Sequence, residues 1–240
     1  MIDIKEKIKK VTPGFVKNLY RRLDDFVKWD SHFQKSWSQE GEDMVLSRFF
    51  EDSKNIGFFV DIGAHHPCKY SNTYKFYRKG WRGINIDAAP GSMKLFNKKR
   101  PLDINLEIAI SEKEENLTYY MFNMPALNTF SQEEAEKKNG KNNYQVIDKK
   151  KIRTERLETI FDKYLKFNQK IDFLTIDVEG FDFQVLKSNN WSKYIPEYIL
   201  VEDLESNVEQ TLSSDLYKFL VSKGYMLIAR TYNTLFFRVK

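Results

Sequence analysis

The chain has 240 residues, of which 41% are hydrophobic, and this is enough for one folded domain with a substantial core. Its single cysteine, Cys68, excludes an intrachain disulfide framework and a cysteine-based zinc site. The formal net charge is +5, but 39 basic residues are interspersed with 34 acidic ones, so we expect no nucleic-acid partner of the kind that binds a dense basic stripe.

Residues 1–35 predict a helical extension ahead of a main domain over residues 36–240. After a Pro-Gly break, apolar residues recur at helical spacing between basic ones, at Phe15, Leu19, Leu23, Phe26 and Val27. Such a helix packs on its own domain or on a second copy as a homodimer, and the alternative is a membrane-surface helix. The start lacks a signal-peptide core, and no run of about 18 apolar residues occurs. We therefore expect a cytoplasmic protein without stable membrane insertion.

Short apolar runs alternate with helical stretches from residue 42 onward. After a helix over 42–50, the runs are 57–63, 83–87, 104–111, 171–177 and 198–203, and a closing hairpin covers 224–229 and 234–239. Buried strands that alternate with helices form a mostly parallel sheet with both faces covered. We therefore predict a Rossmann-like, doubly wound α/β fold that ends in an antiparallel hairpin.

Four of the first five apolar runs end in carboxylates, at Asp61, Asp87, Asp177, and Glu202 with Asp203. In sheets of this kind, ligands bind at the carboxyl ends of the strands. Folding alone does not explain acids that recur at this one place. The pattern therefore predicts a binding site along this edge of the sheet.

The turn after the first run indicates the class of cofactor. Residues 61–64, Asp-Ile-Gly-Ala, supply one of the three glycines of a dinucleotide site, and His65 and Cys68 stand at the other two positions. A cofactor without phosphates, such as S-adenosylmethionine, tolerates these bulkier residues. Asp87 can accept both ribose hydroxyls of an adenosine. The alternative is a structural turn and a solvated acid.

Several blocks of the sequence resemble the FkbM family of methyltransferases. They are Ser38–Asp43, Phe59–Pro67, 71–73, Lys79–Asp87, and 176–180 with Asp182, 185–187 and Trp191. The resemblance covers residues 36–240 and implies a class I methyltransferase fold. It also implies transfer of a methyl group from S-adenosylmethionine to a hydroxyl, usually that of a sugar or a secondary metabolite.

The resemblance also implies which residues bind the cofactor. Asp61, Gly63 and Ala64 would shape the methionine side, and Asp87 would hold the ribose. Segment 108–111 would border the adenine, and Gln39 and Asn72 would lie near the same pocket. The implied set is Gln39, Asp61, Gly63, Ala64, Asn72, Asp87, Ala88, Ala109 and Ser111.

The chemistry of O-methylation suggests roles for the later acids. A sugar hydroxyl must lose its proton as it attacks, so the site needs a general base or a bound cation. Asp177, Glu202 and Asp203 could hold Mg²⁺ or Mn²⁺, which prefer oxygen ligands. Without a metal, Asp177 and Glu179 would act as base or substrate ligands, and the structural alternative is capping of the helix after Gly180.

His65 and His66 are two further candidate catalytic residues. An imidazole titrates near neutrality, which suits a general base. The alternative is that the two histidines hold the cofactor loop through hydrogen bonds.

The polar, lysine-rich segment 123–153 predicts an insertion that forms a lid or substrate loop. Its residues 126–131 are expected to face the acceptor, and its Asn, Tyr and Lys residues suit a nucleotide-linked sugar or a surface-polysaccharide precursor. The leading prediction is therefore a sugar O-methyltransferase. The alternatives are a methyltransferase for a non-sugar metabolite, one for RNA or protein, and a non-catalytic S-adenosylmethionine-binding protein. Asp-Val-Glu-Gly at 177–180, in place of an Asn-Pro-Pro-Tyr-type motif, argues against transfer to a base nitrogen.

Overall fold

The computed structural model describes residues 34–51, 56–204 and 207–240, and the single positions 14, 16, 18, 19 and 22. The chain divides into a unit of residues 1–36 and a unit of residues 37–240. The five single positions are helical, but most of the expected N-terminal helix lies outside the described residues, and its packing stays a prediction. Within the described parts of the chain, no helix has the length and apolar character needed to cross a membrane.

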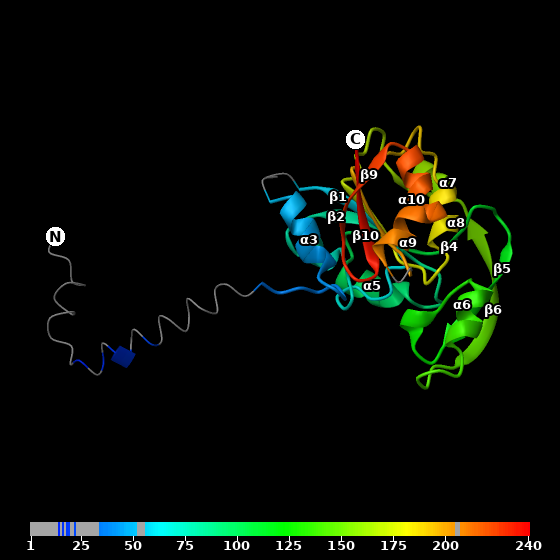
Figure 1. Ribbon diagram of the computed structural model, residues 1–240, viewed down its shortest axis with the longest axis horizontal. Helices are drawn as coiled ribbons and strands as arrows, with labels where there is room; N and C mark the ends of the chain where they lie inside the picture. Colours follow the sequence, from blue (N-terminus) through cyan, green and yellow to red (C-terminus); the bar gives the residue numbers. More distant parts are fainter. Residues whose placement is uncertain are drawn as a thin grey trace. The chain divides into compact units, whose positions relative to one another are not determined.

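A seven-stranded sheet forms the centre of residues 37–240 (Figure 1), with the spatial order β3-β2-β1-β7-β8-β10-β9. Strand β10 runs antiparallel to both of its neighbours, and the other pairings are parallel. The bounds are Phe58–Ile62 (β1), Arg82–Asp87 (β2), Ile104–Glu107 (β3), Phe173–Ile176 (β7), Tyr198–Glu202 (β8), Tyr225–Arg230 (β9) and Thr234–Val239 (β10). The prediction of an α/β fold with a mostly parallel sheet is confirmed.

Helices cover both faces of this sheet. They are α3 (Glu42–Phe49), α4 (Tyr74–Arg78), α5 (Met93–Lys99), α7 (Leu157–Tyr164), α8 (Asp182–Lys187), α9 (Val208–Ser213) and α10 (Asp215–Ser222). Val60 and Leu174 belong to a core cluster with side chains of α7, α8 and α10. Phe59 and Phe173 point to the other face and pack with side chains of α3 and α4. Because both faces are buried, these strands appear in the sequence as continuous apolar runs.

The segment between β3 and α7 forms a second sheet of three strands, in the order β4-β6-β5. Its elements are β4 (Ala109–Ile110), β5 (Asn116–Phe122), a 3₁₀ turn η1 (Pro125–Leu127), α6 (Gln132–Lys138) and β6 (Val146–Glu155). Strands β5 and β6 form an antiparallel hairpin that lies to one side of the central sheet in Figure 1. Residues 112–155 are called the insertion below.

The apolar run 104–111 is two strands rather than one. Strand β3 pairs with β2 in the central sheet, whereas β4 pairs with β6 in the second sheet. Ile108 lies between them, and its backbone N–H donates to the carbonyl of Asp87 at 3.2 Å. The chain therefore changes sheet at Ile108, next to the end of β2.

Candidate active site

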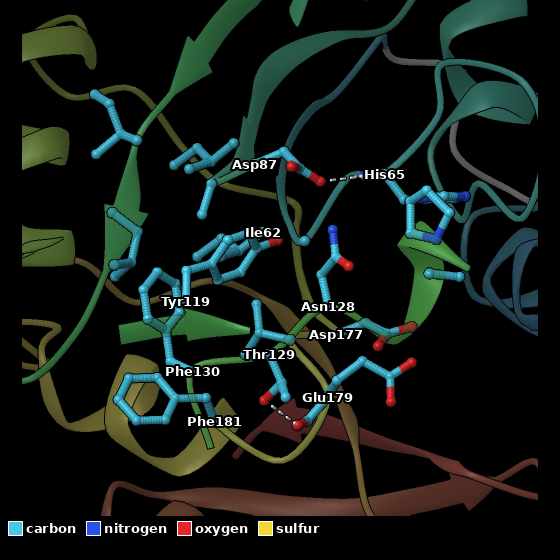
Figure 2. A pocket seen from close by; sticks show the side chains of 18 residues that line it. Ile62, His65, Asp87, Tyr119, Asn128, Thr129, Phe130, Asp177, Glu179 and Phe181 are labelled. Carbon is cyan, nitrogen blue, oxygen red and sulfur yellow. Dashed lines mark hydrogen bonds between the residues drawn. The ribbon is translucent and has the colours of Figure 1, made fainter. Parts of the chain in front are cut away.

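A cleft lies at the carboxyl edge of the central sheet, between that sheet and the insertion (Figure 2). The side of the central sheet contributes Gly63, Asp87 and Asp177. The side of the insertion contributes Tyr119 and Asn128. The cleft is therefore built from both sheets.

Gly63 lets two strand ends meet at the floor of this cleft. Its φ of 82° is in the left-handed region, and its N–H donates to the carbonyl of Ile86 at 2.9 Å. A Cβ at this position would lie 1.7 Å from the carbonyl oxygen of Asp177. The close approach of the β1 and β7 loops therefore requires glycine here, whatever ligand binds.

Asp87 closes β2 with a carboxylate that is held by backbone donors. Its Oδ2 accepts from the N–H of His65 at 2.9 Å, and its Oδ1 accepts from the N–H of Ala89 at 2.7 Å. Burial raises the pKa of Asp87, and these two hydrogen bonds offset part of that rise. A carboxylate has about four acceptor positions, so capacity remains for the hydroxyl groups of a ligand.

Asp61 does not line the cleft, although it is only one residue from Ile62, which does. Its Oδ2 accepts from the Thr73 hydroxyl at 2.7 Å, and that hydroxyl accepts from Nη1 of Arg100 at 2.9 Å. Burial raises the pKa of Asp61 to about 6, against the lowering effects of Thr73 and Arg100. Asp61 thus belongs to a buried network behind the cleft.

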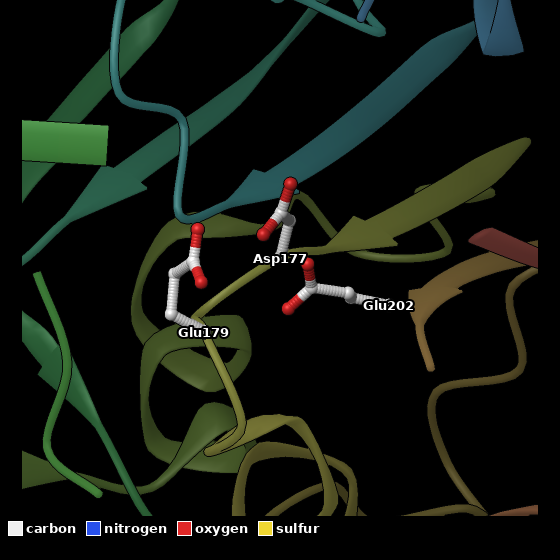
Figure 3. Close-up of side chains that lie close together, drawn as sticks. All are labelled: Asp177, Glu179 and Glu202. Atoms are coloured by element: carbon white, nitrogen blue, oxygen red, sulfur yellow. The ribbon is translucent and has the colours of Figure 1, made fainter. Parts of the chain in front are cut away.

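Three carboxylates gather on the other half of the same edge. Asp177, Glu179 and Glu202 each bring one oxygen within 4.8 Å of the others, and their side chains point toward one another (Figure 3). Glu202 ends β8, and Asp177 directly follows β7. We call these three residues the carboxylate cluster.

Crowding changes the proton affinity of this cluster. The side chain of Asp177 lines the cleft. Desolvation by the surrounding protein, and then the charge of Glu179, raise its pKa well above the usual value. Burial, followed by the charge of Asp177, raises the pKa of Glu202 to about 11. Oε2 of Glu202 is buried and has no hydrogen-bond partner among the described residues. Glu202 therefore carries a proton at neutral pH unless a cation takes its place.

Lys138 of α6 is the cation that contacts the cluster from the insertion. Its Nζ lies 2.5 Å from Oε2 of Glu179 and 3.4 Å from Oε2 of Glu134. Desolvation lowers the pKa of Lys138, but the carboxylates of Glu179, Glu134 and Glu202 outweigh it, and the net pKa is raised. The Thr129 hydroxyl donates to the backbone carbonyl of Glu179 at 2.8 Å. The insertion therefore fixes Glu179 at both its side chain and its backbone.

Asp203 stands apart from the carboxylate cluster. Its Oδ2 accepts from the Thr211 hydroxyl at 2.5 Å, and its N–H donates to the carbonyl of Asn233 at 2.7 Å. Of the predicted metal ligands, the structure brings Asp177 and Glu202 together and adds Glu179, and Asp203 is not in that group.

The two histidines have different surroundings. Nδ1 of His66 accepts from the N–H groups of Cys68 and Lys69, both at 3.0 Å. A neutral imidazole that accepts at Nδ1 carries its proton on Nε2, so His66 is engaged in holding the loop. Burial lowers the pKa of His66 and favours this neutral form. His65 lines the cleft instead, with a left-handed φ of 49°.

The cleft contains only part of the predicted site. The predicted residues that line it are Gly63, His65, Asp87, Ala88, Asp177 and Glu179. The other predicted cofactor residues lie outside the lining set: Gln39, Asp61, Ala64, Asn72, Ala109 and Ser111. The amide of Asn72 donates to the Thr175 hydroxyl at 3.0 Å. Ile108 and Ile110 line the cleft in place of their neighbours Ala109 and Ser111, because successive side chains of a strand alternate in direction.

Two aromatic residues of the cleft, Tyr119 and Phe181, are missing from the predicted set. Tyr119 lies in the stretch 116–122, whose aromatic content is typical of a strand. That signal could have identified β5. No local pattern indicates that β5 packs over the cleft.

Comparisons with known proteins identify the family. A family model described as the methyltransferase FkbM domain matches residues 61–227, which is most of the chain. A solved structure from Pyrococcus horikoshii, assigned as an RNA methyltransferase, aligns with 87% of this chain and 92% of its own, at 10% identity and a TM-score of 0.43. A search of curated proteins gives no match. The family prediction is confirmed: the chain belongs to the FkbM methyltransferase family, whose members are enzymes that transfer methyl groups.

Proposed function

We propose that this chain is an S-adenosylmethionine-dependent O-methyltransferase that acts on a sugar hydroxyl of a nucleotide-linked or surface-polysaccharide precursor. Membership of the FkbM family supports methyl transfer. The carboxylate cluster beside the cleft is the observation that carries the assignment to oxygen. A hydroxyl must lose its proton as it attacks, and a carboxylate of this cluster can receive it.

The two ends of the cleft suit the two ends of the cofactor. Asp87 would accept from the ribose hydroxyls, and Ala88, Ile108 and Ile110 would flank the adenine. The sulfonium would then lie toward Asp177, at the end of the cleft where the carboxylates gather. This orientation places the positive charge of the cofactor near negative charge.

Asp177 is the proposed general base. In an in-line displacement the acceptor oxygen bonds to the methyl carbon as the carbon–sulfur bond breaks, and the hydroxyl proton passes to the base. Without a cofactor, the raised pKa of Asp177 makes it hold a proton more readily than an ordinary carboxyl group. A sulfonium nearby would lower that pKa, because an opposite charge favours the ionised form. Cofactor binding would therefore favour the ionised form of Asp177, which can act as a base.

The donor set also fits a hard divalent cation. Asp177, Glu179 and Glu202 present only oxygen ligands, and one oxygen of Glu202 is buried without a partner among the described residues. Mg²⁺ and Mn²⁺ prefer such ligands. When bound, the ion would make an acceptor hydroxyl more acidic. We propose these three residues as its ligands.

Methyl transfer from labelled S-adenosylmethionine to a panel of nucleotide sugars tests the proposal. The wild type, Asp177→Ala and the control Asp162→Ala would be compared with and without EDTA. Asp162 is an exposed acid on α7 that pairs with Lys193. We expect transfer by the wild type and the control, and loss of transfer in Asp177→Ala.

Each outcome of this assay has a definite meaning. Loss of transfer in EDTA supports the divalent ion, whereas transfer that survives EDTA removes it and leaves Asp177 as base. Tight cofactor binding without transfer to any sugar contradicts the sugar acceptor. A wild type that does not bind S-adenosylmethionine contradicts the cofactor itself.

A further inference from the structure

Strand β5 places Tyr119 over the cleft from the side of the insertion. Only 6% of Tyr119 is exposed, and its ring lies 4.6 Å from that of Phe130, centroid to centroid. The next residue, Tyr120, carries the Nζ of Lys149 at 5.1 Å from its ring centroid and does not line the cleft. The alternation of the strand thus directs one tyrosine into the cleft and its neighbour away from it.

The segment that follows η1 holds Tyr119 in position. Tyr120 and Thr129 form an antiparallel bridge, with N–H to carbonyl distances of 2.8 and 3.2 Å. Oδ1 of Asn128 accepts from the N–H of Phe122 at 2.8 Å, which leaves its amide NH₂ as the donor group. The Asn128 side chain lowers the pKa of Tyr119, against the rise that burial and Asp87 cause, so it acts on the tyrosine hydroxyl. The Tyr119 hydroxyl donates to no acceptor among the described residues, so its hydrogen is available to a ligand.

Across the cleft from Tyr119 lies Asp87 (Figure 2). Burial and then the negative charge of Asp87 raise the pKa of Tyr119, so the tyrosine keeps its proton and remains a donor. Asp87 can only accept hydrogen bonds when it is ionised. A ribose diol both donates and accepts, so it complements an acceptor on one wall and a donor on the other.

We propose that Tyr119 donates a hydrogen bond to a ribose oxygen of the cofactor, opposite Asp87, and is thereby a cofactor-binding residue supplied by the insertion. The inference rests on the proposed use of S-adenosylmethionine. It gives the insertion a role in binding the cofactor as well as in facing the acceptor. Phe130, beside Tyr119, forms part of the same wall.

Calorimetry with S-adenosylhomocysteine tests this role on the full chain. Tyr119→Phe removes the hydroxyl and keeps the ring, and Tyr120→Phe makes the same change one residue away on the outer side. We expect Tyr119→Phe to weaken binding about tenfold, which is the size of one lost hydrogen bond, and Tyr120→Phe to change it less than twofold. Unchanged thermal unfolding of both variants would show that they fold.

A second pair of ligands separates hydrogen bonding from packing. Adenosine carries the ribose hydroxyls, and 2′,3′-dideoxyadenosine lacks them. We expect Tyr119→Phe to weaken adenosine binding and to leave the dideoxy compound at its wild-type affinity. Equal weakening of both ligands, or unchanged binding of S-adenosylhomocysteine, overturns the proposal and leaves the cofactor assignment standing. A wild type that binds no S-adenosylhomocysteine overturns both.

Discussion

The two halves of the carboxyl edge carry acids in opposite electrostatic settings. On the β1–β2 half, Asp61 and Asp87 accept hydrogen bonds from hydroxyl and N–H donors. On the β7–β8 half, Asp177 and Glu202 face other carboxylates, and one oxygen of Glu202 has no partner among the described residues. The first setting suits neutral hydroxyl groups of a ligand, and the second suits a cation. The donors around an acid, more than its place in the fold, determine what it binds.

The largest expected effect comes from the point where the two halves touch. Gly63→Ala would force a Cβ against the carbonyl of Asp177 at a left-handed φ, and we expect it to destabilise the fold by at least about 3 kcal/mol. Gly91→Ala is the matched control, because its φ is 83° but its nearest neighbour is the Cε of Lys94 at 3.9 Å. Urea unfolding of both variants measures the difference. Equal losses would show that backbone conformation, and not the contact between the halves, is responsible.

An intermediate effect is expected at Asp61, whose pKa of about 6 exceeds the ordinary value of 3.8. A folded state that raises the pKa of an acid binds more protons than the unfolded state, so this stabilisation is complete below about pH 4 and is lost as the pH rises through 6. In Asp61→Asn the position no longer titrates. The difference in unfolding free energy between wild type and variant should therefore fall by about 2 kcal/mol from pH 4 to pH 7. A difference that stays constant with pH would contradict the buried, partly protonated state of Asp61.

A smaller effect is expected in the discrimination between two forms of the cofactor. S-adenosylmethionine is positive at sulfur and S-adenosylhomocysteine is not, so deprotonation of the carboxylate cluster should favour the former. We expect the ratio of their affinities to rise as the pH is raised and Asp177 ionises, and Asp177→Asn to flatten that rise. Asp87→Ala should weaken both ligands and leave the ratio unchanged. Calorimetric titrations at a series of pH values measure both effects, and a ratio that is independent of pH in the wild type would contradict a sulfonium near Asp177.

The sequence predicts where the acids gather because parallel strands that end in acids bring them to one edge. It does not predict which of two adjacent residues faces the cleft. Ile62 lines the cleft while Asp61 bonds to Thr73 behind it, and Asp203 bonds to Thr211 while Glu202 joins the cluster. These outcomes depend on strand direction and on donors that are distant in the sequence.

The second sheet is harder to predict for a different reason. Strand β4 has two residues and continues the apolar run of β3, so nothing in the run marks the change of sheet. Strand β6 is largely exposed and contains Lys149, Lys150 and Lys151, a composition typical of a solvated loop. Residues 146–155 form a strand because they pair with β5. The contribution of Tyr119 to the cleft depends on that pairing, which no local pattern specifies.

The pairing of β4 with β6 has a consequence for redesign. The insertion begins and ends at adjoining residues, since the N–H of Ser111 donates to the carbonyl of Glu155 at 3.0 Å. We therefore expect that the insertion can be replaced by a segment from another protein, joined at these two residues, without any change to the seven central strands. Such a graft also exchanges Tyr119 and Lys138, which face the cleft and the carboxylate cluster. A change of acceptor specificity by this route thus also requires redesign of the insertion residues that line the cofactor side of the cleft.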